Sequence, residues 1–271
     1  MSSKTPVLLT FDMDAETLWT ARDPAGASKP VWLSQGHYGP TVGLPRILDL
    51  LHRYALTATF FIPGKVVETY PEQIDAILAA GLPIEHHSYS HTWSDNLSAE
   101  AEEGEFQKGW DAIVAATGRK PQGWRSPAGE LTANSIPLME RFGFSFSSNM
   151  FDADTAYLLR DGDRTTEIVE LPFAWALDDA PFFLYSNRLP GRVMSAPSAV
   201  VETWCREYDG IASEPGTHFM IGMHPQVIGR PSRLWALEQT VQHLLDSDSA
   251  EFVTCAEYAA RMRPALLKVG S

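Results

Sequence analysis

Short apolar runs alternate with segments of helical periodicity along the chain. The runs that we interpret as strands cover residues 7–12, 56–62, 82–86, 123–125, 144–148, 168–172, 218–223 and 252–254. The segments that we interpret as helices cover residues 41–54, 71–80, 98–117, 134–142, 197–208, 234–245 and the region from 256 onward. Strands that alternate with helices in this way predict a parallel sheet built from βα units.

Two regions interrupt this alternation. Residues 15–40 are rich in Gly, Pro, Trp and small polar residues, which predicts a long loop. Long loops in compact domains are often functional, and the aromatic residues of this one could line a pocket or pack the loop against the core. Residues 152–166 are charged and contain glycine, so we expect a surface excursion there.

Polar residues follow several of the expected strands at their carboxyl ends. They are Asp12, Asp14, His87, His91, Arg125, the region 175–179 and His224. In parallel α/β barrels the active site lies at this face and takes residues from several strands. Because there are seven or eight βα units and no internal repeat or linker, we expect residues 1–271 to form one barrel domain. A doubly wound open sheet is the alternative.

Composition narrows the classes of function. The chain has 271 residues, of which 44% are hydrophobic, and carries a formal net charge of −13. An acidic surface argues against nucleic acid and anionic membranes as partners. Cys205 and Cys255 have no metal-binding spacing, so we expect buried free thiols. The sequence shows no apolar signal segment or membrane span, which predicts a cytoplasmic protein.

His87 and His91 are four residues apart, directly after an expected strand. On a helical turn this spacing places two imidazoles on one face, where they could share a divalent ion. Asp12 and Asp14 alternate at the end of the first strand, where carboxylates are costly unless something compensates them. Asp14, His87 and His91 would form a catalytic metal site with positions left for water and substrate; zinc fits it, and other divalent ions fit as well. Surface histidines and a capping aspartate are the alternatives.

Three residues could supply the proton chemistry. Asp12 is the natural general base beside such an ion, and Arg125 could hold it through a bidentate pair. His224, in the run Met223-His224-Pro225, could act as general acid toward a leaving amine because histidine titrates near neutral pH. The alternatives are an ordinary salt bridge for Arg125 and a buried, hydrogen-bonded imidazole for His224.

These residues stand in the order of known motifs. The motifs are Thr10-Phe11-Asp12-Met13-Asp14, His87-Ser88-Tyr89-Ser90-His91, Arg125-Ser126-Pro127-Ala128-Gly129 and His224-Pro225. Together they resemble the motifs of the NodB-type polysaccharide deacetylases, carbohydrate esterase family four, over nearly the whole chain. The resemblance implies a distorted (β/α)7 barrel that hydrolyses amide bonds, commonly removing N-acetyl groups from amino sugars with a divalent metal. It implies the following roles: Asp12 as base, Asp14, His87 and His91 as ligands, Arg125 as the residue that orients the base, and His224 as acid.

The match departs from the family pattern in two places. Met13 separates two acids that are adjacent in the usual first motif, and the fourth motif is only loosely present in residues 171–179. The stretch 224–234 resembles a subgroup with peptidoglycan deacetylase-like, allantoinase-like and cyclic imide hydrolase-like members. Because all three ligand positions are retained, we expect a metal. The residues expected to contact substrate are Glu16, Trp19, Trp175, Asp178 and Arg230.

Two activities and one non-enzymatic role follow from this resemblance. Hydrolysis of a small cyclic imide or ureide would need a closed pocket, which residues 15–40 and 178–185 could supply. N-deacetylation of amino sugars or peptidoglycan would need an open groove. The expected cytoplasmic location favours the small cyclic substrate, because cell-wall glycans lie outside the membrane. A barrel that binds carbohydrate without turnover is the third alternative, and the resemblance also predicts a homo-oligomer.

Overall fold

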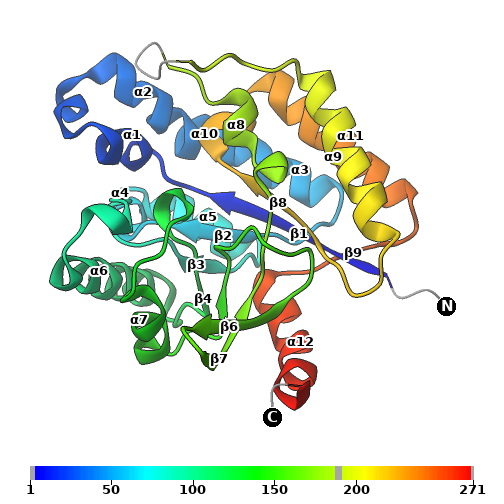
Figure 1. Ribbon diagram of the computed structural model, residues 1–271. Coiled ribbons are helices and arrows are strands. Elements are labelled where there is room, and N and C mark those ends of the chain that lie inside the picture. Colours follow the sequence, from blue (N-terminus) through cyan, green and yellow to red (C-terminus); the bar gives the residue numbers. More distant parts are fainter. Residues whose placement is uncertain (1–3, 187–190, 270–271) are drawn as a thin grey trace.

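The computed structural model describes residues 4–186 and 191–269, and a β-sheet runs through its centre (Figure 1). Within these residues nine strands form one sheet in the order β6-β7-β5-β4-β3-β2-β1-β8, while β9 pairs with β1. The strands are β1 (Thr5–Asp12), β2 (Thr59–Ile62), β3 (Ile84–His86), β4 (Gly123–Trp124), β5 (Phe146–Ser147), β6 (Tyr157–Asp161), β7 (Arg164–Glu170), β8 (Phe219–Met223) and β9 (Ala250–Phe252). The pairing of β6 with β7 is antiparallel, and the other pairings of these strands are parallel.

The parallel strands curl into a half-barrel in which β1 pairs with three strands, β2, β8 and β9. Val7 of β1 is in register with both Phe219 of β8 and Phe252 of β9, so these two strands lie on opposite edges of β1. The order of paired strands ends at β8 on one side and at β6 on the other. This curled arrangement confirms the α/β fold expected as a distorted (β/α)7 barrel, and the carboxyl ends of its parallel strands share one rim.

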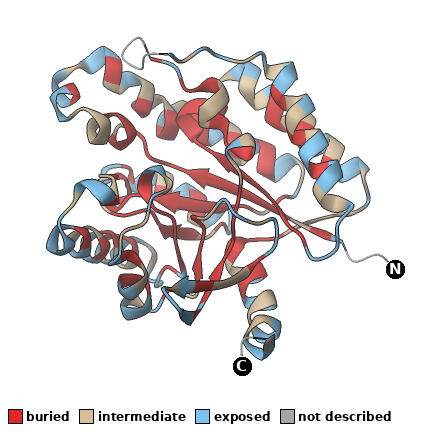
Figure 2. Ribbon diagram, in the orientation of Figure 1, coloured by how far each residue is buried: buried red, intermediate tan, exposed pale blue. Residues whose placement is uncertain are grey.

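Helices surround the sheet (Figure 1). They are α1 (Thr17–Arg22), α2 (Pro30–Tyr38), α3 (Leu44–Arg53), α4 (Gly64–Thr69), α5 (Pro71–Ala79), α6 (Ala99–Thr117), α7 (Ser135–Phe142), α8 (Asp179–Phe183), α9 (Pro197–Ala212), α10 (Pro225–Ile228), α11 (Pro231–Asp246) and α12 (Cys255–Val269). Figure 2 shows most of the sheet buried, while the helices alternate between buried and exposed positions. The core therefore lies between the sheet and the inner faces of these helices.

Local sequence explains where the helices lie and end. Leu44 and Ile47 are buried on the inner face of α3, as their spacing predicts. Ser98 is the N-cap of α6, and its hydroxyl accepts a hydrogen bond from the backbone N–H of Ala101 at 3.3 Å. Gly118 ends that helix with a φ of 66°, a conformation that glycine takes without a steric penalty.

The prediction of a long loop over residues 15–40 was wrong, because most of this region is helical. Pro24 and Pro30 stand in the first turns of a 3-10 helix and of α2, where the missing N–H of proline costs no hydrogen bond. A Cβ on Gly36 would lie 2.5 Å from the carbonyl oxygen of Ala15. This glycine therefore serves close packing between segments and not a turn.

The expected surface excursion over residues 152–166 is instead part of the sheet. Strands β6 and β7 form a hairpin that turns at Gly162, which has a φ of 60°. Leu159 and Ile168 of this hairpin are buried in a cluster with Phe106 and Trp124. The charged residues of the segment lie outside this hydrophobic cluster.

Both cysteines are free thiols, as expected. Cys255 is buried, whereas Cys205 is half-buried. Burial raises the pKa of the Cys255 thiol to about 12. Among the helices that the structure describes, each is too short or too polar to cross a membrane.

Candidate active site

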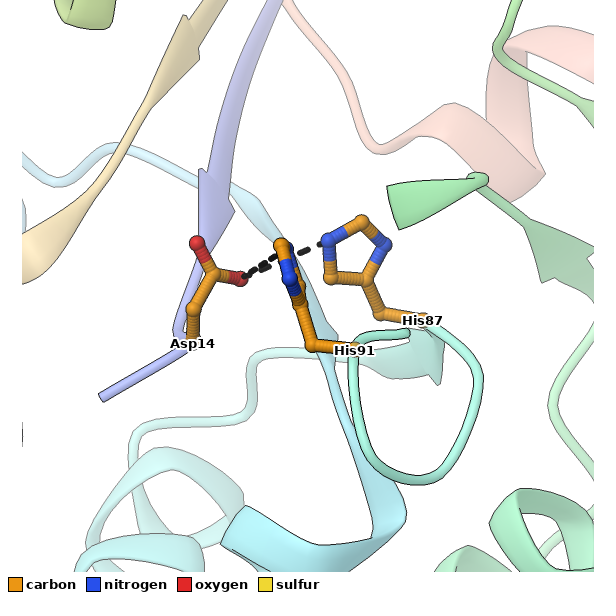
Figure 3. A group of neighbouring side chains, drawn as sticks. All are labelled: Asp14, His87 and His91. Carbon is orange, nitrogen blue, oxygen red and sulfur yellow. Dashed lines mark ion pairs between the residues drawn. The ribbon is translucent and has the colours of Figure 1, made fainter. Parts of the chain in front are cut away.

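Asp14, His87 and His91 converge beyond the carboxyl ends of β1 and β3 (Figure 3). Asp14 follows β1 by two residues, and His87 comes directly after β3. Oδ1 of Asp14 lies 3.4 Å from Nε2 of His87 and 3.6 Å from Nε2 of His91. All three side chains are buried. The structure thus brings together the three residues expected as metal ligands.

This donor set fits a divalent cation. The ligand atoms of the three residues all lie within 4.8 Å of one another. Two donors about 2.1 Å from a tetrahedral ion lie roughly 3.4 Å apart, which agrees with the separations from Asp14 to the two imidazoles. Oδ1 of Asp14 has no hydrogen-bond partner among the described residues, although the side chain is completely buried. A cation would offset the cost of burying that oxygen unpaired.

The protonation states in the cluster also suit a cation. Burial works to raise the pKa of Asp14, but the facing imidazoles, His91 foremost, bring it well below its usual range. Burial lowers the pKa of His91 to about 4. Nδ1 of His87 lies 2.7 Å from the carbonyl oxygen of Arg125, so Nδ1 carries the proton of that hydrogen bond. Nε2 of His87 then faces Asp14; burial works to lower the pKa of this imidazole, but the carboxylates of Asp14 and Asp12 raise it. A cation bound at Nε2 would take the place of that proton.

Residues 87–91, the histidine loop, are not helical, so the expected helical turn is wrong. Ser88 and His91 have φ values of 64° and 63°, in the left-handed region that few side chains adopt. Glu105 of α6 accepts hydrogen bonds from the backbone N–H groups of Tyr89 and Ser90, at 3.1 and 2.7 Å. It also accepts from the hydroxyls of Ser88 and Ser90, at 2.9 and 3.0 Å. These bonds hold the loop in the conformation that turns both imidazoles toward β1.

Asp12, the last residue of β1, lies beside this cluster and is bound by Arg125. Nη1 of Arg125 donates to Oδ1 of Asp12 at 2.8 Å and to the hydroxyl of Thr10 at 2.9 Å. Nη2 donates to the hydroxyl of Ser148 at 2.9 Å. The expected bidentate pair is therefore a single hydrogen bond, because Ser148 takes the second nitrogen. The other oxygen of Asp12, Oδ2, lies 4.0 Å from Nε2 of His87.

The guanidinium of Arg125 is itself fixed in place. Its Cζ lies 4.2 Å from the ring centroid of Phe61 and 4.8 Å from that of Phe173. The side chain is buried, so solvent screens its charge little. A cation held between two rings keeps the carboxylate of Asp12 in one orientation, as a general base requires.

His224 faces the other oxygen of Asp14, from a position directly after β8. Its Nε2 lies 3.7 Å from Oδ2 of Asp14. Its Nδ1 lies 2.6 Å from Oδ1 of Asp179, and its backbone N–H donates to Oδ2 of Asp179 at 2.9 Å. Burial alone would lower the pKa of His224, but the charge of Asp179 raises it well above its ordinary value. Asp179 thus orients the imidazole and favours its protonated form, which is the form that a general acid requires.

These groups share one cavity of about 420 Å³ at the rim of the half-barrel. This volume lies within the range of pockets for small ligands. The residues of the wall include Asp12, His87, His91, Arg125, Ser148, Phe173, Trp175, Asp178 and His224. The predicted base, acid and two of the predicted ligands therefore face the same space.

Two of the residues expected to contact substrate, Trp175 and Asp178, line this cavity. Trp175 is 50% exposed and stacks on Phe151, with ring centroids 4.8 Å apart. Asp178 is buried at the N-cap of α8, where its Oδ1 accepts the backbone N–H of Ala180 at 2.7 Å. Trp175 is thus accessible to a ligand, whereas Asp178 also has a structural role.

The other three expected contacts lie outside the cavity wall. Glu16 accepts a hydrogen bond of 2.6 Å from the hydroxyl of Tyr70. Trp19 is buried in the core. The guanidinium of Arg230 lies 3.5 Å from the ring centroid of Tyr38. Because residues 15–40 are helical, Glu16 and Trp19 pack inward instead of extending over the site, and their position does not support a contact with substrate.

Three charged residues of the site were not expected as functional. Asp179 orients His224. Its position beside Asp178 in the loosely matching fourth motif is the sequence feature that could have indicated this role. Arg22 and Arg192 line the cavity. No motif marks them, because they reach the cavity only through the folding of the segments that carry them.

Known proteins resemble this chain in sequence and in fold. The family model described as polysaccharide deacetylase matches residues 26–147. A proposed polysaccharide deacetylase from Mycobacterium smegmatis is 32% identical, and its crystal structure gives a TM-score of 0.91 over 97% of this chain and 92% of that one. The chain belongs to the polysaccharide deacetylase family. This is a family of deacetylases, which hydrolyse the carbon–nitrogen bond of an amide.

Two further proteins that resemble this polysaccharide deacetylase-family chain have different names. A peptidoglycan deacetylase from Helicobacter pylori is 29% identical over 283 residues, which cover 96% of each chain. The crystal structure of the PuuE allantoinase is 20% identical, with a TM-score of 0.83 over 96% of this chain and 90% of that one. The second likeness shows a shared fold alone.

Proposed function

We propose that this polysaccharide deacetylase-family protein removes N-acetyl groups from amino sugars of the kind found in peptidoglycan, with a divalent metal as cofactor. One observation carries the proposal. A fixed carboxylate, Asp12, and a fixed imidazole, His224, face the same cavity beside a buried three-donor cluster. A base and an acid in this relation suit the hydrolysis of an amide, which needs a proton removed from water and a proton given to nitrogen.

The side chains divide the reaction between them. When bound, a divalent ion supplies Lewis acidity, which polarises the amide carbonyl and lowers the pKa of water. Asp12 takes a proton from the attacking water on Oδ2, the oxygen that does not bind Arg125. His224 gives the proton on Nε2 to the sugar nitrogen, so that the C–N bond breaks and the amine and acetate leave. Asp179 keeps its bond to Nδ1 and thereby keeps Nε2 toward the cavity.

Two observations favour an amino sugar over the cyclic imide that the sequence favoured. The relative named a peptidoglycan deacetylase can be aligned with 96% of this chain and 96% of its own. The similarity to an allantoinase shows a shared fold alone. Trp175 also offers a half-exposed aromatic surface at the cavity, against which the C–H face of a pyranose ring can pack. The preference for a cyclic imide depended on the expected cytoplasmic location. That expectation carries less weight than these two observations.

Zinc as the metal, a homo-oligomer and a cytoplasmic location stay predictions from the sequence. Two histidines and one carboxylate are a donor set that zinc accepts in catalytic sites. Glu16, Trp19 and Arg230 stay predictions as substrate contacts as well, without support from their positions.

One hydrolysis panel tests the proposal. The purified protein is incubated with N-acetylglucosamine oligomers and, separately, with small cyclic imides and ureides, each with and without a chelator. Acetate release from the amino sugars, abolished by the chelator, is expected. Ring opening of an imide, with no acetate from any amino sugar, would overturn the proposal.

Two variants separate the base from the metal ligands in this panel. Asp12→Asn is expected to lower kcat by about 10²–10⁴ while the metal content stays unchanged. Asp246→Asn, on the exposed end of α11, is the matched control and should behave like the unchanged protein. Equal rates for Asp12→Asn and Asp246→Asn would show that Asp12 is not the base.

A further inference from the structure

Two arginines in the cavity wall take no part in the hydrolysis described above. Arg22 is the last residue of α1, and Arg192 lies in the segment before α9. Every Asp and Glu of the chain lies within the described ranges 4–186 and 191–269. Across those ranges, no acidic side chain forms an ion pair with either arginine. The two positive charges therefore face the cavity without a counter-ion from the protein.

The environment of Arg22 shows the cost of this arrangement. The pKa of Arg22 is lowered, first by burial and next by the positive charge of Arg192. Nε of Arg22 is buried and has no hydrogen-bond partner among the described residues. Its Cζ lies 5.5 Å from the ring centroid of Trp93, and Nη1 of Arg192 donates to the carbonyl of Ala180 at 3.3 Å. These contacts orient both guanidinium groups but do not neutralise them.

The carboxylates in the same wall have other partners. Asp12 binds Arg125. Oδ1 of Asp178 accepts the backbone N–H of Ala180, and burial raises the pKa of Asp178 to about 7, so only about half of its charge is present at neutral pH. Asp14 attracts Arg22 at long range, but its oxygens face three imidazoles. An anion from outside the chain would therefore be the direct partner of the two arginines.

We propose that Arg22 and Arg192 form a subsite for a carboxylate on the substrate, so that the preferred substrate is an N-acetylated amino sugar that carries a carboxylate. The inference rests on the proposed deacetylase function, because it concerns the ligand of that same cavity. Guanidinium groups match the geometry of carboxylates and hold them through charge-assisted hydrogen bonds. The subsite would act on substrate binding and not on the bond that breaks.

A matched pair of sugars tests the subsite. N-acetylmuramic acid differs from N-acetylglucosamine by a lactyl ether that carries a carboxylate. Binding of each sugar is measured by calorimetry on Asp12→Asn, which removes turnover, and kcat/KM is measured on the active protein. We expect N-acetylmuramic acid to bind about tenfold or more tightly, since a hydrogen bond to a charged group contributes that much. Equal affinities for the two sugars would overturn the subsite.

Variants assign the preference to the two arginines. Arg22→Gln and Arg192→Gln should each remove most of the preference in both measurements, whereas Arg22→Lys should keep part of it because it keeps the charge. Arg206→Gln, which removes an exposed charge on α9, is the control and should keep the full preference. A preference that survives in the double variant Arg22→Gln/Arg192→Gln would contradict the proposal.

The two proposals fail in distinguishable ways. If neither sugar releases acetate, the deacetylase proposal fails, while the binding measurement still decides whether a carboxylate is recognised. If acetate is released from both sugars with equal kcat/KM and equal affinity, the deacetylase stands and the subsite falls.

Discussion

Glu105 of α6 and Ser90 of the histidine loop are joined by two hydrogen bonds, from the backbone N–H of Ser90 at 2.7 Å and from its hydroxyl at 3.0 Å. The same carboxylate also binds Ser88 and Tyr89. We predict that Glu105→Ala lowers metal affinity about 10–100-fold, because residues that orient metal ligands typically contribute that much. Titration of the chelator-stripped protein with zinc measures the effect.

The control for this variant lies two residues away. Glu103→Ala removes a carboxylate from the same helix that forms an ion pair with Arg141 at the surface. Its metal affinity should match that of the unchanged protein. Glu105→Gln keeps an oxygen for the loop and should fall between the two. If all three variants bind zinc alike, Glu105 does not position the histidine loop.

Gly109 of α6 lies against the start of the same loop. A Cβ at this position would lie 2.5 Å from Nε2 of His86 and 2.6 Å from the carbonyl oxygen of Ser88. We predict that Gly109→Ala lowers the free energy of unfolding by about 1–3 kcal/mol, the usual cost of overpacking, and also weakens metal binding. Gly104→Ala, in the same helix, meets no atom within 4 Å and should instead stabilise by up to about 1 kcal/mol. Urea unfolding measures both, and a stabilised Gly109→Ala would contradict the tight contact.

The sequence predicted the elements that depend on strong periodicity. The apolar run of β1 ends at Asp12, the run of β3 ends just before His87, and the run of β8 ends just before His224. Because parallel strands present their carboxyl ends at one rim, the order of these residues along the chain was enough to predict that they meet. The sequence could therefore indicate that these side chains lie close together, while their roles as ligands, base and acid stay predictions.

The conformations that depend on contacts distant in sequence were not predicted. The left-handed φ of Ser88 and His91 is stabilised by Glu105, which no local pattern connects to them. The glycine content of residues 15–40 indicates a loop, although Gly36 of this region serves close packing against Ala15. The histidine spacing was therefore interpreted as a helical turn, and residues 15–40 as a loop.

Asp179 and His224 are the next pair that a substitution can test. Asp179→Asn removes the charge that keeps the imidazole protonated and one acceptor of its two hydrogen bonds. We predict that kcat falls by about 10²–10⁴, the usual contribution of a positioned acid, while metal content stays unchanged because Asp179 contacts none of the three ligands directly. Asp178→Asn removes a carboxylate one residue away that binds Ala180 instead, and should lose less. If kcat falls equally in the two variants, the negative charge beside the cavity matters and the hydrogen bond from Asp179 to His224 does not.

His218 gives the fold a pH dependence that is separate from the site. Its side chain is buried, Nε2 lies 2.8 Å from the carbonyl oxygen of Pro172, and burial lowers its pKa to about 4. In the unfolded chain its pKa returns to about 6.5. Below that value the unfolded state binds a proton that the folded state does not, so stability is complete above about pH 6.5 and is lost as the pH falls toward 4. The loss from this group between about pH 7.5 and 5 comes to roughly 2 kcal/mol.

We therefore predict that His218→Gln loses less stability on acidification than the unchanged protein, by roughly 2 kcal/mol between about pH 7.5 and 5. Urea unfolding at both pH values measures it, with a chelator present in every sample so that pH-dependent metal binding does not contribute. His52→Gln, at an exposed position of α3, is the matched control and should keep the full acid loss. If His218→Gln and His52→Gln lose the same stability between the two pH values, the buried imidazole of His218 is not the source of the acid sensitivity.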